Sequence, residues 1–143
     1  MVKNFRFVEP GLALSAAPSS AEEIDWLNGQ GVRLIVSLHP VPDEVVKRMR
    51  ELGIEWRPLL MTDFVGGPPP GFRETLDEVR KKTSEEPAAL IHCSGGGGRA
   101  GTVYAAYQIR GGADPDEIIT KTPGVSREDQ ISFLRGWAAG VGA

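Results

Sequence analysis

Two short, mostly apolar runs, residues 32–38 and 88–92, and a third, mixed segment, residues 54–59, are spaced along the chain. Between them apolar residues recur every three or four positions. Short apolar runs of this kind, rich in β-branched residues in the first of them, are typical of strands buried on both faces of a parallel sheet. We therefore predict three strands and take residues 32–38 as a central strand.

The segments between the strands have the periodicity and end signals of amphipathic helices. Ser20, followed three residues later by Glu23, forms a capping-box pattern ahead of Ile24 and Leu27, which share one helix face. Glycines after the last periodic residue indicate where such helices end. The other helices are predicted to begin at Pro42, Phe72, residue 102, Asp114 and Ser126, the last carrying Ile131, Leu134 and Trp137 on one face.

Strands that alternate with helices indicate an α/β fold with right-handed crossovers. We predict a single domain over residues 1–143, with a central, mostly parallel sheet of four to five strands and helices on both faces. Residues 61–70 form a Gly- and Pro-rich loop after the second predicted strand. Gly66 and Gly67 would provide a hinge and the following prolines a stiff end, so we predict that this loop moves as a lid.

Composition narrows the function classes. The chain has 41% hydrophobic and 24% charged residues and a formal net charge of -3, which gives no electrostatic reason to expect a nucleic-acid partner. It has no apolar run long enough for a signal peptide or a bilayer span, so we expect a cytoplasmic monomer without a membrane partner. The single cysteine excludes an intramolecular disulfide and a multi-cysteine metal site; no metal or cofactor is expected.

The chemistry is concentrated in I-H-C-S-G-G-G-G-R-A-G-T, which starts at Ile91, at the carboxyl end of the third predicted strand. Glycines there allow successive N–H groups to converge on one anion, helped by the following helix dipole. Arg99 adds a planar fork for two oxygens, and Cys93 supplies a nucleophile. The predicted phosphate-binding residues are Ser94, Gly95, Gly96, Gly97, Gly98 and Arg99.

Three alternatives compete with a phosphate site. The loop could be a glycine-rich turn beside an inert buried cysteine. It could be a nucleotide-binding P-loop, but that requires a lysine before its Ser or Thr, and this loop has none. It could be a sulfurtransferase-type loop, which is typically shorter between cysteine and arginine.

The pattern H-C-x5-R, formed by His92, Cys93 and Arg99 and followed by Gly101 and Thr102, resembles the signature of the cysteine-dependent protein tyrosine phosphatase superfamily. Nearly the whole chain resembles its small, atypical dual-specificity phosphatases. The stretches that carry this resemblance are N-F-R-F-V-E-P-G-L-A, G-V-R-L-I-V-S-L, T-D-F and T-P-G-V-S-R-E-D-Q. It implies a protein tyrosine phosphatase-like fold and hydrolysis of phosphomonoesters through a phosphocysteine intermediate. The implied substrates are phosphorylated proteins that carry phosphotyrosine, and the resemblance leaves open whether phosphoserine and phosphothreonine are also accepted.

The resemblance also implies roles for single residues. Asp63 would be the general acid and later the base, and Gln130 would orient the water that hydrolyses the phosphocysteine. His92 and Thr102 would support the loop. Without the resemblance, Asp63 would be interpreted as a turn-capping residue and Gln130 as a solvent-facing one. We interpret His39 as a loop residue rather than a catalyst.

One position departs from the family pattern. Ala100 stands where the family usually has Ser or Thr, whose hydroxyl donates a hydrogen bond to the cysteine sulfur. Without this hydrogen bond, hydrolysis of the phosphocysteine should be slower, unless Ser94, Thr102 or a water donates to the sulfur instead. This departure also supports an alternative function, a phosphotyrosine-binding module with little or no turnover. Because the chain has no basic cluster, a phosphoprotein is favoured over a polyphosphoinositide or an RNA 5'-triphosphate as ligand.

Overall fold

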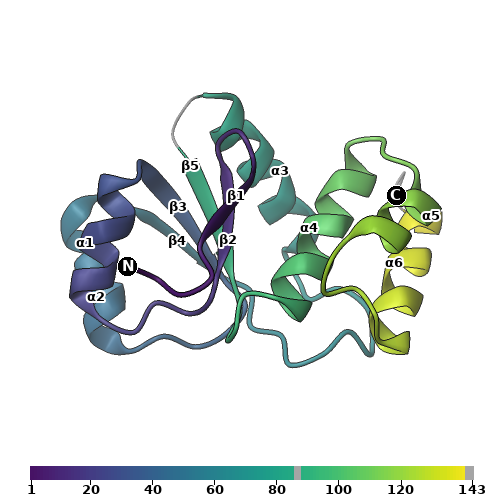
Figure 1. The fold of residues 1–143 in the computed structure, drawn as a ribbon, viewed down its shortest axis with the longest axis horizontal. Helices are drawn as coiled ribbons and strands as arrows, with labels where there is room; N and C mark the ends of the chain where they lie inside the picture. The colour runs from purple at the N-terminus through teal and green to yellow at the C-terminus, as the bar shows by residue number, and fades with distance from the viewer. Residues whose placement is uncertain (86–87, 141–143) are drawn as a thin grey trace.

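A five-stranded sheet forms the centre of the protein (Figure 1). The fold is taken from a computed structural model, which describes residues 1–85 and 88–140. The strand order is β1-β2-β5-β3-β4, with β1 antiparallel to β2 and the other strands parallel. The strands are β1 (Arg6–Glu9), β2 (Leu12–Ser15), β3 (Val32–Ser37), β4 (Glu55–Pro58) and β5 (Ala88–His92).

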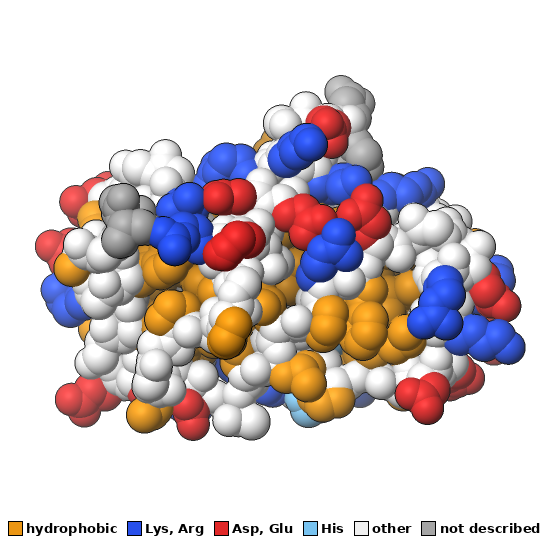
Figure 2. All heavy atoms as spheres, turned by 180° about the vertical axis from the view of Figure 1, so that it is seen from behind, with side chains coloured by type: hydrophobic (Ala, Val, Ile, Leu, Met, Phe, Trp, Pro, Cys, Tyr) orange, Lys and Arg blue, Asp and Glu red, His pale blue; other side chains and the backbone are white. Residues whose placement is uncertain are grey.

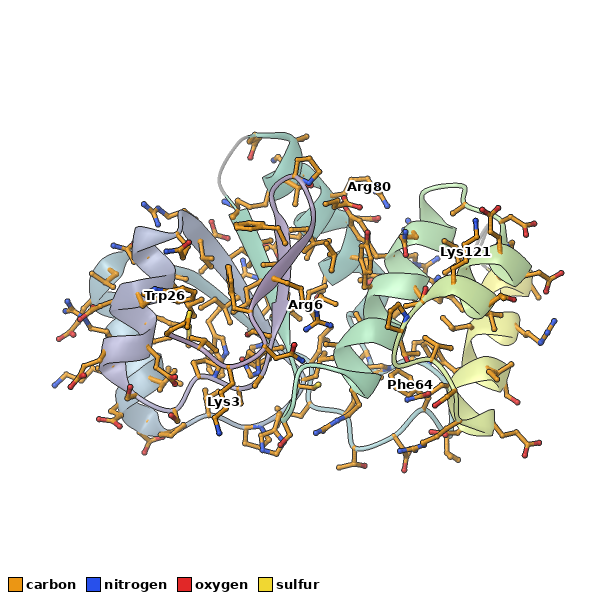
Figure 3. The ribbon with its side chains drawn as sticks, viewed as in Figure 1. Lys3, Arg6, Trp26, Phe64, Arg80 and Lys121 are labelled. Atoms are coloured by element: carbon orange, nitrogen blue, oxygen red, sulfur yellow. The ribbon has the colours of Figure 1, made fainter. Side chains whose placement is uncertain are left out.

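Six helices of the described chain cover both faces of the sheet, which confirms the predicted α/β class. They are α1 (Ala21–Gly29), α2 (Asp43–Leu52), α3 (Phe72–Ser84), α4 (Gly98–Arg110), α5 (Pro115–Lys121) and α6 (Glu128–Gly140). Helices α1 and α2 lie on one side, and α3 and α4 on the other, with α5 and α6 packed outside α4 (Figure 1). Trp26 of α1 and Phe64 lie on opposite sides of the sheet (Figure 3).

Alternation along the strands divides the core into two clusters. Ile35 and Leu90 belong to the cluster under α1 and α2, whereas Leu34 and Ile91 belong to the cluster under the other helices. Successive strand residues point to opposite faces of a sheet, so a strand apolar at every position contributes to both clusters. This is why the runs at residues 32–38 and 88–92 are continuous rather than alternating.

The sheet differs from the predicted one in two ways. Strands β1 and β2 were not predicted, because each has only four residues and is stabilised by pairing, β2 with β5 far along the chain. Strand β3 is an interior strand as predicted, but β5 is the middle strand, since it pairs with β2 on one side and β3 on the other. The strand that precedes the glycine loop is therefore held along both edges.

Three helix ends also differ from the predictions. Pro42 has an extended backbone and is the N-cap of α2 rather than its first residue. Helix α4 begins at Gly98, inside the glycine run. Helix α6 begins at Glu128, and Ser126 does not cap it; the N–H groups of Ser126 and Arg127 donate instead to the Gln130 side chain. Ser20 does cap α1, accepting from the N–H of Glu23 at 3.2 Å.

No helix in residues 1–85 and 88–140 is long and apolar enough to cross a membrane.

Candidate active site

The site lies where the parallel strands end. In the sheet register Ser15, His92 and Ser37 lie side by side, and Pro58 follows on the far side of Ser37. Cys93 comes directly after this row. The loops that leave the parallel strands therefore meet at one edge of the sheet, the place where open α/β sheets bind ligands.

The carbonyl groups of the loop after Cys93 are held from outside. The Ser94 carbonyl accepts from the N–H of Ala17 at 3.0 Å, and the Gly95 carbonyl accepts from the side-chain amide of Asn4 at 3.1 Å. A peptide group places its C=O and its N–H on opposite sides. The N–H groups that follow these carbonyls are therefore turned to the inside of the loop.

One inward N–H reaches the sulfur. The Gly96 N–H donates to Cys93 Sγ at 3.2 Å, and Cys93 is 3% exposed. Gly96 has φ +86°, and a Cβ on it would lie 2.5 Å from the carbonyl carbon of Ser15. Only glycine combines that backbone conformation with so close an approach to β2. Gly96 is thus required where the loop passes the end of β2.

Ala100 and Thr102 lie behind the loop. Ala100 is fully buried in the core, and Thr102, also fully buried, donates its hydroxyl proton to the Gly98 carbonyl at 2.7 Å. Thr102 thus contacts the loop it was predicted to support, but its one proton is used there. It does not replace the hydroxyl that the family has at residue 100; the Gly96 N–H is the donor to the sulfur.

Arg99 is directed to the rim of the site. Its Nη1 donates to the Met61 carbonyl at 2.7 Å, and its Nη2 lies 3.5 Å from Nδ1 of His39. Arginine only donates, so His39 Nδ1 is the acceptor in this contact. The sequence interpretation of His39 as a loop residue missed this contact. The guanidinium thereby joins the phosphate loop to the loops after β3 and β4.

His92 is buried behind Cys93 as part of a hydrogen-bond chain. Its Nδ1 lies 3.1 Å from the Cys93 carbonyl, which only accepts, so Nδ1 carries the proton. Its Nε2 therefore accepts from the Ser37 hydroxyl at 2.6 Å, and Ser37 accepts from Trp56 Nε1 at 2.8 Å. Burial lowers the pKa of His92 to about 4. The imidazole is neutral and holds the backbone at Cys93.

Asp63 lies on the surface of the loop after β4. Its carboxylate accepts from the N–H of Val65 at 2.9 Å, the turn-capping contact expected without a catalytic role. It is two residues beyond Met61, which Arg99 binds, so its loop is attached to the phosphate loop. The next residue, Phe64, is buried, and its N–H donates to Asp129 at 3.3 Å.

Gln130 is 3% exposed, so the solvent-facing interpretation is wrong. Its Oε1 accepts from the N–H groups of Ser126 and Arg127, at 2.9 and 3.0 Å. On the other side, a Cβ added to Gly98 would lie 3.1 Å from its Nε2. The first turn of α6 thus places the Gln130 amide against the phosphate loop.

Comparison with known proteins agrees with this geometry. Residues 2–141 match the family model for the Swiss Army Knife protein, DSP-PTPase phosphatase domain (PTP-SAK). The chain belongs to this family. It is a dual-specificity phosphatase-like domain of the cysteine-dependent protein tyrosine phosphatase superfamily, as its sequence resemblance implied. A comparison with curated protein sequences finds no significant match.

Solved structures share the fold at low sequence identity. Tk-PTP in its active form is 22% identical with a TM-score of 0.78, over 98% of this chain and 99% of that one. PTPMT1 in complex with PI(5)P is 19% identical with a TM-score of 0.71, over 96% of both chains. P. aeruginosa TpbA in complex with pTyr is 22% identical with a TM-score of 0.64, over 96% of this chain and 83% of that one.

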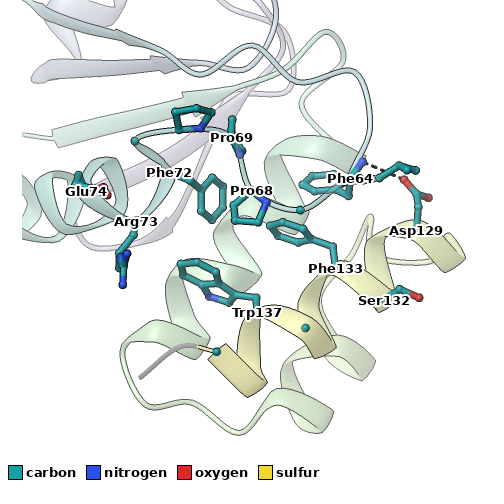
Figure 4. Close-up of a pocket in the computed structure, with 17 residues that line it drawn as sticks. Phe64, Pro68, Pro69, Phe72, Arg73, Glu74, Asp129, Ser132, Phe133 and Trp137 are labelled. Carbon is teal, nitrogen blue, oxygen red and sulfur yellow. Dashed lines mark hydrogen bonds between the residues drawn. The ribbon is translucent and has the colours of Figure 1, made fainter. Parts of the chain in front are cut away.

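A pocket of about 770 Å³ lies beside the Asp63 loop of this PTP-SAK domain, between residues 64–71, the start of α3 and helix α6 (Figure 4). Four aromatic rings line it: Phe64 and Phe72 contact Phe133, with ring centroids 4.8 and 5.6 Å apart, and Phe72 also contacts Trp137. No phosphate-loop residue lines the pocket. It is a space behind the Asp63 loop and is separate from the loop after Cys93.

Sequence reasoning missed several residues that build the PTP-SAK site. Each of them forms a hydrogen bond within or next to the site: Asn4 with Gly95, Ser37 with His92, Trp56 with Ser37 and Asp129 with Phe64. Asn4 had no signal in the sequence; the structure shows it as a non-glycine residue at φ +58°. Ser37 could have been noticed as a polar residue ending an apolar strand. Among the described residues, no group of three or more His, Cys, Asp and Glu side chains could hold a metal.

Proposed function

We propose that this domain is an enzyme that hydrolyses phosphomonoesters through a phosphocysteine intermediate. The observation that carries the proposal is the Gly96 N–H directed at Cys93 Sγ, in a loop whose carbonyls are held from outside. Such a loop stabilises a thiolate and binds the oxygens of a tetrahedral phosphate with the same N–H groups.

The reaction has two steps. The Cys93 thiolate attacks phosphorus in line with the ester oxygen, so the Sγ–P bond forms as the P–O bond breaks, and Asp63 gives its proton to the leaving oxygen. A water oriented by Gln130 then attacks phosphorus and gives a proton to Asp63, which releases phosphate and the thiolate. Arg99 binds two phosphoryl oxygens throughout, once it exchanges the Met61 carbonyl for them.

The substrate that we propose is phosphotyrosine in a protein. The phosphate loop offers glycines and no lysine, so no loop side chain is available for a second phosphate group. On the face shown in Figure 2, Lys and Arg side chains lie beside Asp and Glu side chains rather than in one basic patch. The TpbA structure contains pTyr and that of PTPMT1 contains PI(5)P, so both chemistries belong in the test.

Phosphate release from a phosphotyrosine peptide, p-nitrophenyl phosphate and PI(5)P tests the proposal. We expect turnover of the first two by the wild type and none by Cys93→Ser, since no other group forms the covalent intermediate. Loss of Asp63 should lower kcat/KM about 10²- to 10⁴-fold for the peptide. Acid quenching followed by mass spectrometry should recover phosphate on Cys93.

The alternative is a phosphotyrosine-binding module. It is favoured by Ala100 and by the Asp63 carboxylate, which is engaged with Val65. A wild type that binds the phosphopeptide but releases no phosphate and forms no phosphocysteine would establish that function. Faster turnover of PI(5)P than of the peptide would reassign the substrate class but leave the mechanism in place.

A further inference from the structure

Two segments that carry predicted catalytic residues are joined by one hydrogen bond. The N–H of Phe64 donates to Asp129 Oδ2 at 3.3 Å (Figure 4). Phe64 directly follows Asp63, the proposed acid, and Asp129 directly precedes Gln130, the residue proposed to orient water. The two partners are 65 residues apart in sequence. The contact thus connects the acid loop to helix α6, which is packed against α4.

A second contact holds the same residue. The Phe64 ring is 3% exposed and lies against Phe133, one turn further along α6, with centroids 4.8 Å apart. Val65, in contrast, is 75% exposed, and Asp63 is also exposed. Phe64 is therefore attached to α6 through both its backbone and its ring. The Asp63 side chain extends from the residue next to this attachment.

Asp129 is itself held in place. Arg127 binds both of its carboxylate oxygens, Nε to Oδ1 at 2.9 Å and Nη2 to Oδ2 at 2.8 Å. The Asp129 side chain is 18% exposed and that of Arg127 is 60% exposed. So exposed an ion pair adds little stability, but its two-point geometry restricts the carboxylate to one orientation. The Arg127 guanidinium also lowers the pKa of Asp129, so it remains an ionised acceptor.

We propose that Asp129 is a positioning residue for the general acid, which fixes the backbone after Asp63 through the Phe64 N–H and so sets where the Asp63 carboxyl stands over the phosphate loop. The proposal rests on the proposed function. Asp129 does not touch the substrate; it acts through Phe64. Its loss should therefore affect proton donation and leave the nucleophile and the phosphate loop unchanged.

Proton donation can be measured separately from attack by changing the leaving group. A general acid matters most when the leaving oxygen is strongly basic and little when it is a weak base. We expect Asp129→Ala to lower kcat/KM about 10-fold for phenyl phosphate and less than about 2-fold for a phenyl phosphate with several fluorine substituents. The loss of about 10-fold is smaller than that expected for removing Asp63 itself, because the acid is displaced and not lost. Asp129→Asn, which keeps an acceptor oxygen, should fall between.

Glu128→Gln is the matched control. Glu128 is the exposed neighbour of Asp129 at the start of α6 and carries the same charge at the same helix terminus. The Glu128→Gln variant should keep kcat/KM for both substrates within about 2-fold of the wild type. Amide hydrogen exchange gives a readout independent of activity. The Phe64 N–H should exchange faster in Asp129→Ala than in the wild type or in Glu128→Gln.

Failure of the proposed function and failure of the positioning role of Asp129 give different results. A wild type that forms no phosphocysteine overturns the proposed function, and exchange at Phe64 still decides whether Asp129 holds the loop. Unchanged exchange at Phe64 in Asp129→Ala overturns the positioning role. So does an equal fall in kcat/KM for both leaving groups, which would show that Asp129 acts on the fold or the phosphate loop rather than on the acid.

Discussion

The Ser37 hydroxyl lies 2.6 Å from Nε2 of His92, and it donates to that nitrogen because Nδ1 carries the ring proton toward the Cys93 carbonyl. Ser37 also accepts from the Trp56 indole N–H. The order of donors and acceptors is therefore fixed from Trp56 in β4 through Ser37 in β3 and His92 to the Cys93 carbonyl. A buried chain in which each group is satisfied keeps the Cys93 backbone in one place.

Removing the Ser37 hydroxyl, the middle group of this hydrogen-bond chain, should destabilise the folded protein. Ser37→Ala leaves the buried His92 Nε2 and the partly buried Trp56 indole N–H without their partner, so we expect a loss of about 1–3 kcal/mol in the free energy of unfolding. Urea unfolding measures it. Ser84→Ala, which removes an exposed hydroxyl on α3, should change the same quantity by less than about 0.5 kcal/mol. If Ser37→Ala loses no more stability than Ser84→Ala, the hydrogen-bond chain through Ser37 does not stabilise the fold.

His92 should make the protein less stable in acid. Burial lowers its pKa from 6.5 to about 4, so below pH 6.5 the unfolded chain binds a proton that the folded chain does not. The free energy of unfolding should fall as the pH drops from 6.5 to about 4, by up to about 1.4 kcal/mol per pH unit from this residue. His92 contributes no such dependence above that window.

Urea titrations at several pH values measure this slope. In a His92→Asn variant the part of the slope due to the imidazole should disappear, leaving that of the carboxylates. An identical slope in the wild type and in the variant would show that the residue titrates normally in the folded protein.

The glycines of the phosphate loop should not be equivalent. Gly96→Ala combines a φ of +86° with a Cβ 2.5 Å from backbone atoms of Ser15, so the loop must rearrange. We expect vanadate affinity and kcat/KM to fall at least about 100-fold, since oriented loop donors carry most of the phosphate binding.

Gly95→Ala is the paired control for this prediction. A Cβ at Gly95 meets nothing within 4 Å, so vanadate affinity should change less than about 3-fold, as for a surface substitution. Equal effects of the two substitutions would show that neither the positive φ of Gly96 nor its contact with β2 sets it apart from Gly95.

Ala100→Ser restores the hydroxyl that the family pattern has at this position. The Gly96 N–H is the donor to Cys93 Sγ, and the Thr102 proton is used on Gly98, so the wild type should accumulate phosphoenzyme and release product in a burst. A second donor should make the sulfur a better leaving group. We expect kcat to rise about 3- to 10-fold, within the effect of one hydrogen bond to a charged group.

Rapid-quench measurement of the burst checks this, with Cys93→Ser as the baseline. The burst should shrink relative to the steady state in Ala100→Ser. Because Ala100 is fully buried, an unfolding curve must show that the variant is folded. A folded variant with an unchanged or lower kcat would refute this role of the missing hydroxyl.

Much of the fold was predictable because its signals are local. Strand β5 has the predicted bounds, Ala88–His92, since a mostly apolar run ends there shortly before the glycines. Ser20 caps α1 as predicted, although the Glu23 carboxylate accepts from Ser19 rather than returning to the Ser20 N–H. Strands β1 and β2 had no comparable signal, because their four-residue lengths make sense only beside their partners.

In the site, too, local signals were predictable and long-range contacts were not. Cys93, the glycines and Arg99 lie close together in the sequence, so the chain by itself predicts an anion-binding loop after a strand. Which groups surround that loop depends on contacts between residues far apart: His39 with Arg99, Ser37 with His92, and Phe64 with Asp129, separated by 60, 55 and 65 residues. Those contacts were decided only by strand register and helix packing, because they bring together side chains that no local pattern pairs.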